Sequence, residues 1–367
     1  ALMKVKKLDD WVAGHKKPMI ISGPCSIESK EQFFATIEGL KTTGINYIRG
    51  GIWKPRTRPG TFEGIGNKGL EWIKEAKVKY QVEIATEVAT PQHVDLALNA
   101  GIGLIWIGAR TTVSPFIVQE IAESLRGVDI PVFIKNPINP DLSLWKGAIE
   151  RFYKADITKL GAIHRGFDSF QKTKYRNVPL WQIPIELKSE FPDLPLICDP
   201  SHIAGKRSMV QEIAQKALDL NYDGLMIESH INPSEALSDA EQQLTPSALK
   251  DLLNKLEYRD ATNADRAFTD QLDIIREQID QADREILEAI ATRMNLVEKI
   301  GKFKKENNVA IFQISRWKEI FKTRPKWAKA LNLDADFIKE LYRFIHQQSV
   351  KKQTGIYKTK GKIEKDL

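Results

Sequence analysis

Cysteine is scarce in this sequence, with two residues, Cys25 and Cys198, among 367. Two cysteines are too few for the disulfide framework of a small secreted protein, and they are better suited to a metal ligand or a buried thiol. Long apolar runs are missing too. No stretch approaches the roughly 18 residues that a membrane helix needs, and the first residues lack the apolar segment of a signal peptide. We therefore expect a cytoplasmic protein without a membrane partner.

A basic stripe interleaved with aromatic residues, which is typical of nucleic-acid-binding proteins, is also lacking. The formal net charge is +7, and residues 270–367 carry 21 Lys and Arg against 15 Asp and Glu. Part of this excess lies in the final segment, 354–367, which we interpret as a solvated basic tail. No nucleic-acid partner is expected. The apolar fraction of 42% is that of an ordinary globular protein.

From residue 19 to 256, short apolar runs alternate with amphipathic stretches, a pattern that indicates repeated βα units and a parallel sheet. Eight such runs can be counted: "MIISGPC", "INYIRGG", "VEIATEV", "GLIWIGA", "PVFIKN", "LGAIHRG", "LPLICDP" and "GLMIESH". Eight strands, each followed by a helical stretch, favour a (β/α)₈ TIM barrel over an open doubly wound sheet. We assign this α/β barrel to residues 1–256.

Each apolar run ends with side chains that can take part in chemistry. They are Cys25, Arg49, Glu87, Arg110, Lys135, Arg165, Asp199 with His202, and Glu228 with His230. Burying so many charged groups would cost several kcal/mol apiece unless they were paired. Because the carboxyl ends of barrel strands share one rim, where such barrels hold their active sites, we expect these groups to converge there.

Four residues at this rim are candidate metal ligands: Cys25, His202, Glu228 and Asp239. One thiolate, one imidazole and two carboxylates suit a divalent transition metal such as Mn²⁺, Fe²⁺, Co²⁺ or Zn²⁺. Composition does not choose among these metals.

Cations are concentrated at the same predicted rim. Arg49, Arg110, Lys135 and Arg165 end four different strands, and Lys54 and Arg56 follow in the loop "KPRTRPG". Forked guanidinium donors match phosphate and carboxylate geometry. We therefore predict a small substrate with several negative charges. Pro55 and Pro59 stiffen the loop and reduce the entropy lost when it closes on a phosphate.

The C-terminal part has a different pattern. After a polar linker at 257–269, apolar residues recur every three or four positions for about 35 residues, which predicts one long helix. Two shorter helices are expected near 313–323 and 335–352. At about 100° per residue, Arg293 and Lys304 share one helix face, whereas Arg276 lies about 100° from Arg293. A partner chain could complete the set, so this smaller all-α domain, 270–353, could be a coiled-coil dimeriser, a regulatory module or a second enzyme.

The barrel motifs are recognisable as a set. "GPCS", "RGGIWKPRT", "GART", "KN", "HRG", "DPSH" and "IESH" followed by Asp239 resemble, in order and spacing, the short bacterial 3-deoxy-D-arabino-heptulosonate-7-phosphate (DAHP) synthases. The resemblance implies condensation of phosphoenolpyruvate with erythrose 4-phosphate, with release of phosphate. The related octulosonate-phosphate synthases are an alternative, but they typically have an asparagine-containing sequence in place of "KPRT".

The same resemblance implies roles for single residues. Phosphoenolpyruvate would be bound by Arg49, Arg110, Lys135 and Arg165, and erythrose 4-phosphate by Lys54, Pro55, Arg56 and Thr57. A divalent metal, for which we expect Mn²⁺ first, would be held by Cys25, His202, Glu228 and Asp239 and would polarise the aldehyde. Lys54 would protonate the new alkoxide, and Glu87 and His202 would steer the attacking water.

The helical segment, about 270–353, resembles the all-helical chorismate mutases without a gap. In that family an intertwined dimer builds each site from two chains. The resemblance implies that Arg276, from the partner, and Arg293 bind the carboxylates of chorismate. It also implies that Lys304 and Gln353 contact the ether oxygen, and that Arg316 and Ser349 assist binding.

Two positions depart from that pattern, since Gln313 and Trp317 stand where relatives are often acidic. We expect an active mutase nevertheless, in a homodimer or larger assembly, with prephenate or chorismate at the helical domain regulating the barrel. The alternative is a non-catalytic sensing or dimerising module attached to the barrel enzyme.

Overall fold

The computed structural model describes residues 3–12, 17–54, 60–170, 173–259, 262 and 266–358. The chain divides into two compact units, Ala1–Ala261 and Thr262–Leu367. In the described part of the chain, no helix combines the length and the apolar character needed to cross a membrane.

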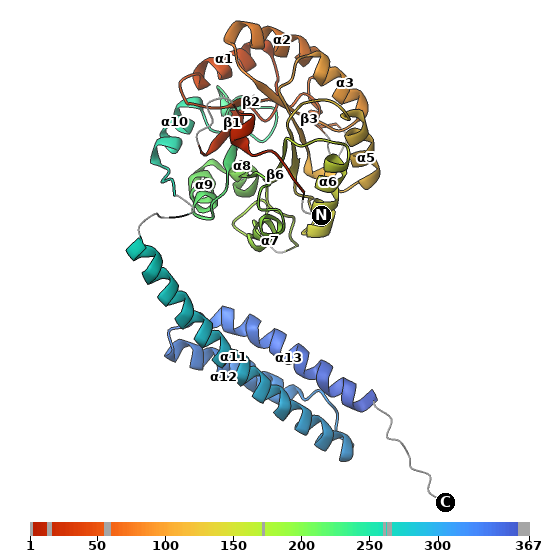
Figure 1. The fold of residues 1–367 in the computed structure, drawn as a ribbon, viewed down its shortest axis with the longest axis vertical. Helices are drawn as coiled ribbons and strands as arrows, with labels where there is room; N and C mark the ends of the chain where they lie inside the picture. The colour runs from red at the N-terminus through yellow and green to blue at the C-terminus, as the bar shows by residue number, and fades with distance from the viewer. Residues whose placement is uncertain are drawn as a thin grey trace, which may run out of the picture. The chain divides into compact units, whose positions relative to one another are not determined.

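The first unit is a closed barrel of eight parallel strands in sequential order, ringed by helices (Figure 1). The strands are β1 Met19–Gly23, β2 Tyr47–Arg49, β3 Ile84–Val88, β4 Leu104–Ile107, β5 Val132–Lys135, β6 Leu160–His164, β7 Leu196–Cys198 and β8 Gly224–Glu228. Each lies within one of the eight apolar runs, so the predicted TIM barrel is confirmed. β1 pairs with β8 over five positions, from Met19 with Gly224 to Gly23 with Glu228, which closes the barrel.

The barrel helices are α1 Lys30–Leu40, α2 Lys68–Tyr80, α3 Pro91–Asn99, α4 Ala109–Thr112, α5 Pro115–Ser124, α6 Leu142–Lys154, α7 Gln182–Glu190, α8 Pro200–Ala204, α9 Val210–Asp219 and α10 Pro246–Lys255. Short 3₁₀ turns are η1 Leu8–Asp10, η2 Arg207–Met209 and η3 Pro233–Glu235. Several helices begin at a side chain that caps a backbone N–H, as Ser29, Thr90, Asp141 and Thr245 do. Such caps fix where each helix starts.

The barrel interior is filled by its own apolar cluster. Trp106 from β4 and Phe133 from β5 are fully buried there, and Leu8 of η1 joins them with Val12. The ring of Trp11 packs edge-on against Phe133, with centroids 6.2 Å apart. Gly161 on β6 leaves room for this ring, because a Cβ at that position would lie 2.1 Å from Phe133 Cε1. The barrel interior beneath the rim is therefore filled largely by apolar side chains.

The described residues of the second unit form three helices, α11 Arg266–Glu306, α12 Ile314–Ala330 and α13 Ala335–Lys358, and α13 packs against both others. Gly301 permits close packing of α11 on α13, since a Cβ there would lie 2.8 Å from Ile356 Cδ1. From Phe268 to Ala289 nearly every side chain of α11 is exposed, including the apolar Ile275, Ile279 and Ile286.

Helix bounds in this unit differ from the expected ones. α11 begins at Arg266, inside the segment expected to be a linker, because nothing in "RAFTD" breaks a helix. α12 extends past its predicted end at 323, and Pro325 lies inside it. α13 extends to Lys358, five residues into the expected tail, where a side chain at Gly355 would meet open space.

A buried histidine ends β6 and ties three segments together. His164 is fully buried, its Nε2 lies 2.6 Å from the carbonyl oxygen of Pro179, and its Nδ1 lies 3.0 Å from the hydroxyl of Tyr222. A carbonyl accepts only, so Nε2 carries the proton and Nδ1 accepts from Tyr222. Burial lowers the pKa of His164 to about 3. The folded barrel therefore holds a neutral imidazole.

This pKa predicts an acid-sensitive barrel. An unfolded histidine titrates near pH 6.5, so between pH 6.5 and 3 the unfolded state binds the extra proton, and stability is lost as pH falls. The contribution is about 1.4 kcal/mol per pH unit. We expect His164→Gln to have a flatter dependence of unfolding free energy on pH than wild type, measured by urea unfolding from pH 7 to pH 4.5. Tyr222→Phe, which keeps the imidazole, serves as the control, and equal slopes for wild type and His164→Gln would contradict the assignment.

Candidate active sites

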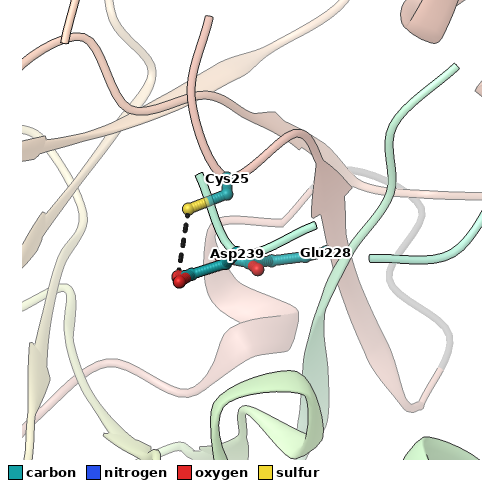
Figure 2. A group of neighbouring side chains, drawn as sticks. All are labelled: Cys25, Glu228 and Asp239. Atoms are coloured by element: carbon teal, nitrogen blue, oxygen red, sulfur yellow. Dashed lines mark hydrogen bonds between the residues drawn. The ribbon is translucent and has the colours of Figure 1, made fainter. Parts of the chain in front are cut away.

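Three side chains, one at the end of β8 and two in the loops after β1 and β8, form a tight group (Figure 2). Cys25 Sγ and one oxygen each of Glu228 and Asp239 lie within 4.8 Å of one another. His202, on α8, places Nε2 3.7 Å from Glu228 Oε1 and 3.7 Å from Asp239 Oδ2. The structure therefore brings together the four residues that the sequence predicts as metal ligands.

The donor set of this group fits a divalent transition metal. It combines one sulfur, one imidazole nitrogen and carboxylate oxygens, which is the mixture that such ions accept. Glu228 is fully buried, and its Oε1 lies 3.2 Å from Arg49 Nη2 as an ion pair but accepts no hydrogen bond from the described residues. A buried carboxylate oxygen without a hydrogen bond is costly, and coordination to a cation would offset that cost.

The charge states of the group follow from its burial. Burial raises the pKa of the Cys25 thiol to about 12, and the Glu228 carboxylate adds to the shift. Burial lowers the pKa of His202. Burial alone would raise the pKa of Asp239, but the charges of His202, Arg176 and Lys54 outweigh it and bring that pKa below its usual range. At neutral pH the group without a cation holds a neutral thiol beside a charged carboxylate.

Two residues that sequence reasoning missed hold the carboxylates in place. Gln242 is fully buried, and its amide donates to Glu228 Oε2 at 2.7 Å. Arg176 Nη1 lies 3.0 Å from Asp239 Oδ1 and 2.6 Å from Gln242 Oε1. The neighbouring Gln243 accepts from the backbone N–H of Cys25 at 2.9 Å. The sequence "SDAEQQ" after β8 could have indicated the two glutamines. Their side-chain amides directly follow the candidate ligand Asp239, so they can hydrogen-bond to groups around the metal site.

Two of the predicted substrate-binding cations are buried over one aromatic ring. The guanidinium carbon of Arg49 lies 4.9 Å from the ring centroid of Trp106, and Lys135 Nζ lies 5.9 Å from it. Arg49 Nη2 also lies 3.2 Å from Glu228 Oε1, while its Nη1 has no hydrogen-bond partner among the described residues. Lys135 Nζ lies 2.9 Å from Asp199 Oδ2, which in turn is 2.7 Å from His202 Nδ1.

The other two cations complete this side of the rim. Arg165 is buried and donates to Asn177 Oδ1 at 2.7 Å. Burial lowers its pKa to about 10, so it remains charged at neutral pH, and the like charge of Arg110 contributes to the shift. Arg110 lies on α4 and is exposed. The predicted cations thus include three buried groups and one that faces solvent.

Lys54 and Glu87 contact different parts of this arrangement. Lys54 Nζ is 3.2 Å from Cys25 Sγ, and Glu87 Oε2 accepts a hydrogen bond from Trp106 Nε1 at 2.9 Å. Lys54 therefore lies beside the candidate metal group, and Glu87 beside the aromatic ring that supports the cations. The remaining predicted aldose-binding residues, Pro55, Arg56 and Thr57, lie outside the described residues.

A second candidate site is a pocket of about 520 Å³ in the helical unit. Five predicted residues line it: Arg293, Lys304, Arg316, Ser349 and Gln353. Arg293 Nη1 donates to Ser349 Oγ at 2.7 Å, and Lys304 Nζ donates to the carbonyl of Ile311 at 2.8 Å. None of the described residues that line this pocket is acidic. Such a pocket suits an anion.

Arg276 is not part of this pocket in the same chain. Its side chain is 65% exposed and pairs with Asp273 at 3.3 Å on the exposed part of α11. Of the two departures from the mutase pattern, Gln313 lines the pocket, whereas Trp317 packs with Phe321 and His346, at centroid distances of 4.2 Å in both cases. The sequence did not single out Arg324, Tyr342 or His346, which also line the pocket.

Comparisons with known proteins match both units of the chain. Residues 3–263 match the DAHP synthetase I family, and residues 275–354 match chorismate mutase type II. A phospho-2-dehydro-3-deoxyheptonate aldolase of Thermotoga maritima is 30% identical over 249 residues, which cover 68% of this chain and 72% of that protein. A 2-dehydro-3-deoxyphosphooctonate aldolase of Campylobacter jejuni is 27% identical over 271 residues, covering 66% of this chain and 96% of that protein.

Solved structures give the same result for the barrel. The crystal structure of a Thermotoga maritima DAHP synthase matches with a TM-score of 0.61 and 28% identity, covering 69% of this chain and 75% of that one. A truncated form of the Thermotoga enzyme matches with a TM-score of 0.58 and 27% identity, covering 66% of this chain and 88% of that one. With a DAHP synthase barrel followed by a chorismate mutase domain, the chain belongs to the DAHP synthetase I family and is a bifunctional enzyme, a transferase joined to an isomerase.

Proposed function

We propose that the barrel condenses phosphoenolpyruvate with erythrose 4-phosphate, and that the helical unit converts chorismate to prephenate. The observation that carries the first half is the meeting of buried cations with the Cys25, Glu228 and Asp239 group at one rim. Phosphoenolpyruvate offers a phosphate and a carboxylate to those cations, and an aldose phosphate offers an aldehyde to the metal group.

Lys135, Arg165 and Arg110 would bind the phosphate of phosphoenolpyruvate, and Arg49 its carboxylate. Arg49 suits this role because its Nη1 is buried and has no partner among the described residues, although its Nη2 is tied to Glu228. Ion pairs with fixed guanidinium and ammonium groups lower the entropy cost of positioning the enol carbon for attack. Trp106 supports two of these cations from below.

Cys25, His202, Glu228 and Asp239 would hold a divalent ion, Mn²⁺ in our proposal, which supplies Lewis acidity to the aldehyde oxygen. Lys54, near Cys25, would protonate the oxygen that becomes an alkoxide when the new carbon–carbon bond forms. Glu87 and His202 would steer the water that attacks C2 of phosphoenolpyruvate. Pro55, Arg56 and Thr57 would hold the phosphate of erythrose 4-phosphate, as the "KPRT" motif implies.

We expect a chelator to abolish phosphate release from phosphoenolpyruvate and erythrose 4-phosphate, and Mn²⁺ to restore it. Asp239→Ala should lose at least about 100-fold in rate, equivalent to roughly 2.7 kcal/mol of barrier, whereas the exposed neighbour Glu241→Ala should keep full activity. Arabinose 5-phosphate should replace erythrose 4-phosphate poorly. Full activity after exhaustive chelation would contradict the metal role, and a preference for arabinose 5-phosphate would favour octulosonate-phosphate synthesis.

The helical pocket supports the second activity. Chorismate is a dianion with an ether bond that breaks, and the pocket supplies Arg293, Lys304 and Arg316 for its charges, with Gln353 and Lys304 for the ether oxygen. The rearrangement needs no nucleophile, base or metal, because restraint of the substrate and stabilisation of charge in the transition state suffice.

We further propose that a second copy of the chain completes each mutase site with its own Arg276. In support, Arg276 lies on the part of α11 where apolar residues such as Ile275, Ile279 and Ile286 are exposed. An exposed apolar face of this extent is typical of an interface. A symmetric dimer would bury it twice.

Mixing two inactive variants tests this arrangement. Arg276→Ala and Arg293→Ala should each lose most mutase activity. After subunit exchange of equal amounts, about a quarter of the sites would contain both arginines in a statistically assembled dimer, so about a quarter of wild-type activity should return. Arg343→Ala, which changes an exposed arginine on α13, is the control. If wild type converts chorismate but the mixture stays inactive, the shared site is wrong, and if wild type only binds chorismate, the helical unit is a sensor.

Physical fusion of the two activities leads us to propose that prephenate or chorismate bound at the helical unit lowers the synthase rate. Saturating prephenate should therefore reduce phosphate release by wild-type enzyme. Arg293→Ala should resist this inhibition while keeping its basal synthase rate. An unchanged wild-type rate at saturating prephenate would remove the proposal.

A further inference from the structure

Arg324 lines the helical pocket, and the proposed mutase function gives it no role. It lies on α12, two turns after Arg316, and its side chain is half-buried. Its Nη1 donates to Thr323 Oγ1 at 2.8 Å, while its Nε is buried and has no hydrogen-bond partner among the described residues. A guanidinium donor buried without an acceptor is costly. This cost is recovered when an anion contacts the group.

Aromatic rings hold Arg324 in place. Its guanidinium carbon lies 4.4 Å from the ring centroid of Trp327 and 5.9 Å from that of Tyr342. Stacking of this kind restrains the guanidinium group without using its hydrogen-bond donors. Arg324 is thereby pre-organised for a carboxylate, so less entropy is lost on binding.

The described residues that line the pocket around Arg324 also include no acidic partner for its charge. The lining residues Arg293, Lys304 and Arg316 are cationic, and no described lining residue is acidic. Arg324 lies close enough to Arg293 for its charge, after burial, to help lower the pKa of Arg293. Two guanidinium groups near each other with no acid between them repel, and that repulsion is relieved by a ligand carboxylate.

Arg316 is placed less favourably for the same task. Its Nη1 lies 2.7 Å from Glu319 Oε2, and its side chain is 55% exposed. An exposed arginine that is already paired gains little from a further anion, because water screens the attraction and the partner competes for the donors. A half-buried arginine that faces no acid, such as Arg324, gains more.

We propose that Arg324 binds one carboxylate of the mutase substrate, together with Arg293, and contributes more to binding than Arg316 does. The proposal rests on chorismate mutase activity of the helical unit. Arg324 acts on the bound dianion directly, as a binding and specificity residue, and takes no part in proton transfer.

Full-length enzyme with Arg324→Met tests the role, since Met keeps most of the apolar stem and removes the fork. We expect KM for chorismate and Kd for prephenate to rise about 10- to 100-fold, as for loss of a hydrogen-bonded charge pair, with a smaller change in kcat. Arg324→Lys should recover part of the loss. Arg343→Met, on an exposed arginine paired with Glu340, should stay within about twofold of wild type, as expected for a surface ion pair.

A second comparison separates binding from a structural effect. Each monomethyl ester of chorismate lacks one negative charge. If Arg324 binds one carboxylate, the affinities of wild type and Arg324→Met should become nearly equal for one of the two esters and stay different for the other. Equal losses for chorismate and both esters, or an Arg324→Met variant that matches Arg343→Met, would overturn the proposal. Prephenate binding gives this answer even if wild-type turnover, and with it the proposed function, fails.

Discussion

The barrel site depends on burying opposite charges together at one rim of a parallel barrel. Arg49 and Glu228 are both almost fully buried, end two different strands and meet at 3.2 Å. Lys135, Asp199 and His202 form a second chain of contacts at 2.9 Å and 2.7 Å. Breaking a buried pair by removing one partner typically costs about 3–5 kcal/mol. Each group thus depends on the others, and the rim is assembled as one network.

The network leaves particular atoms available. Arg49 Nη1 is buried and has no hydrogen-bond partner among the described residues, and Glu228 Oε1 accepts no hydrogen bond from them although it lies 3.2 Å from Arg49 Nη2. One is a donor suited to an anion, and the other is an acceptor suited to a cation. A site that takes an anionic substrate beside a metal ion needs this combination. The apolar filling beneath, from Trp106 and Phe133, keeps water from reaching these groups from inside the barrel.

Much of this arrangement could be predicted from the sequence, because strand ends are a strong constraint. Once eight apolar runs indicate a barrel, the residue that ends each run must lie at the same rim, and Cys25, Arg49, Lys135 and Glu228 do so. Contacts within loops are not constrained in this way. Arg176 pairs with Asp239, which lies 63 positions later in the sequence, and no periodic pattern predicts that pairing. The bounds of α11 and α13 were missed for a related reason, since helix ends depend on local capping and packing rather than on the apolar period.

The helical unit also gathers cationic side chains, but for a different kind of reaction. Its arginines lie in a pocket lined in part by apolar residues of α11, α12 and α13 and by no described acid. In the barrel, by contrast, the buried Arg49 and Lys135 each have a carboxylate within 4 Å. In the proposed reaction the barrel would keep its charges in place while bonds form and break beside a metal ion, and pairing serves that end. A pericyclic rearrangement asks only that the substrate be folded and its developing charge be matched. Cations such as Arg293, which face no described acid in the pocket, then suffice, because the substrate itself supplies the missing negative charge.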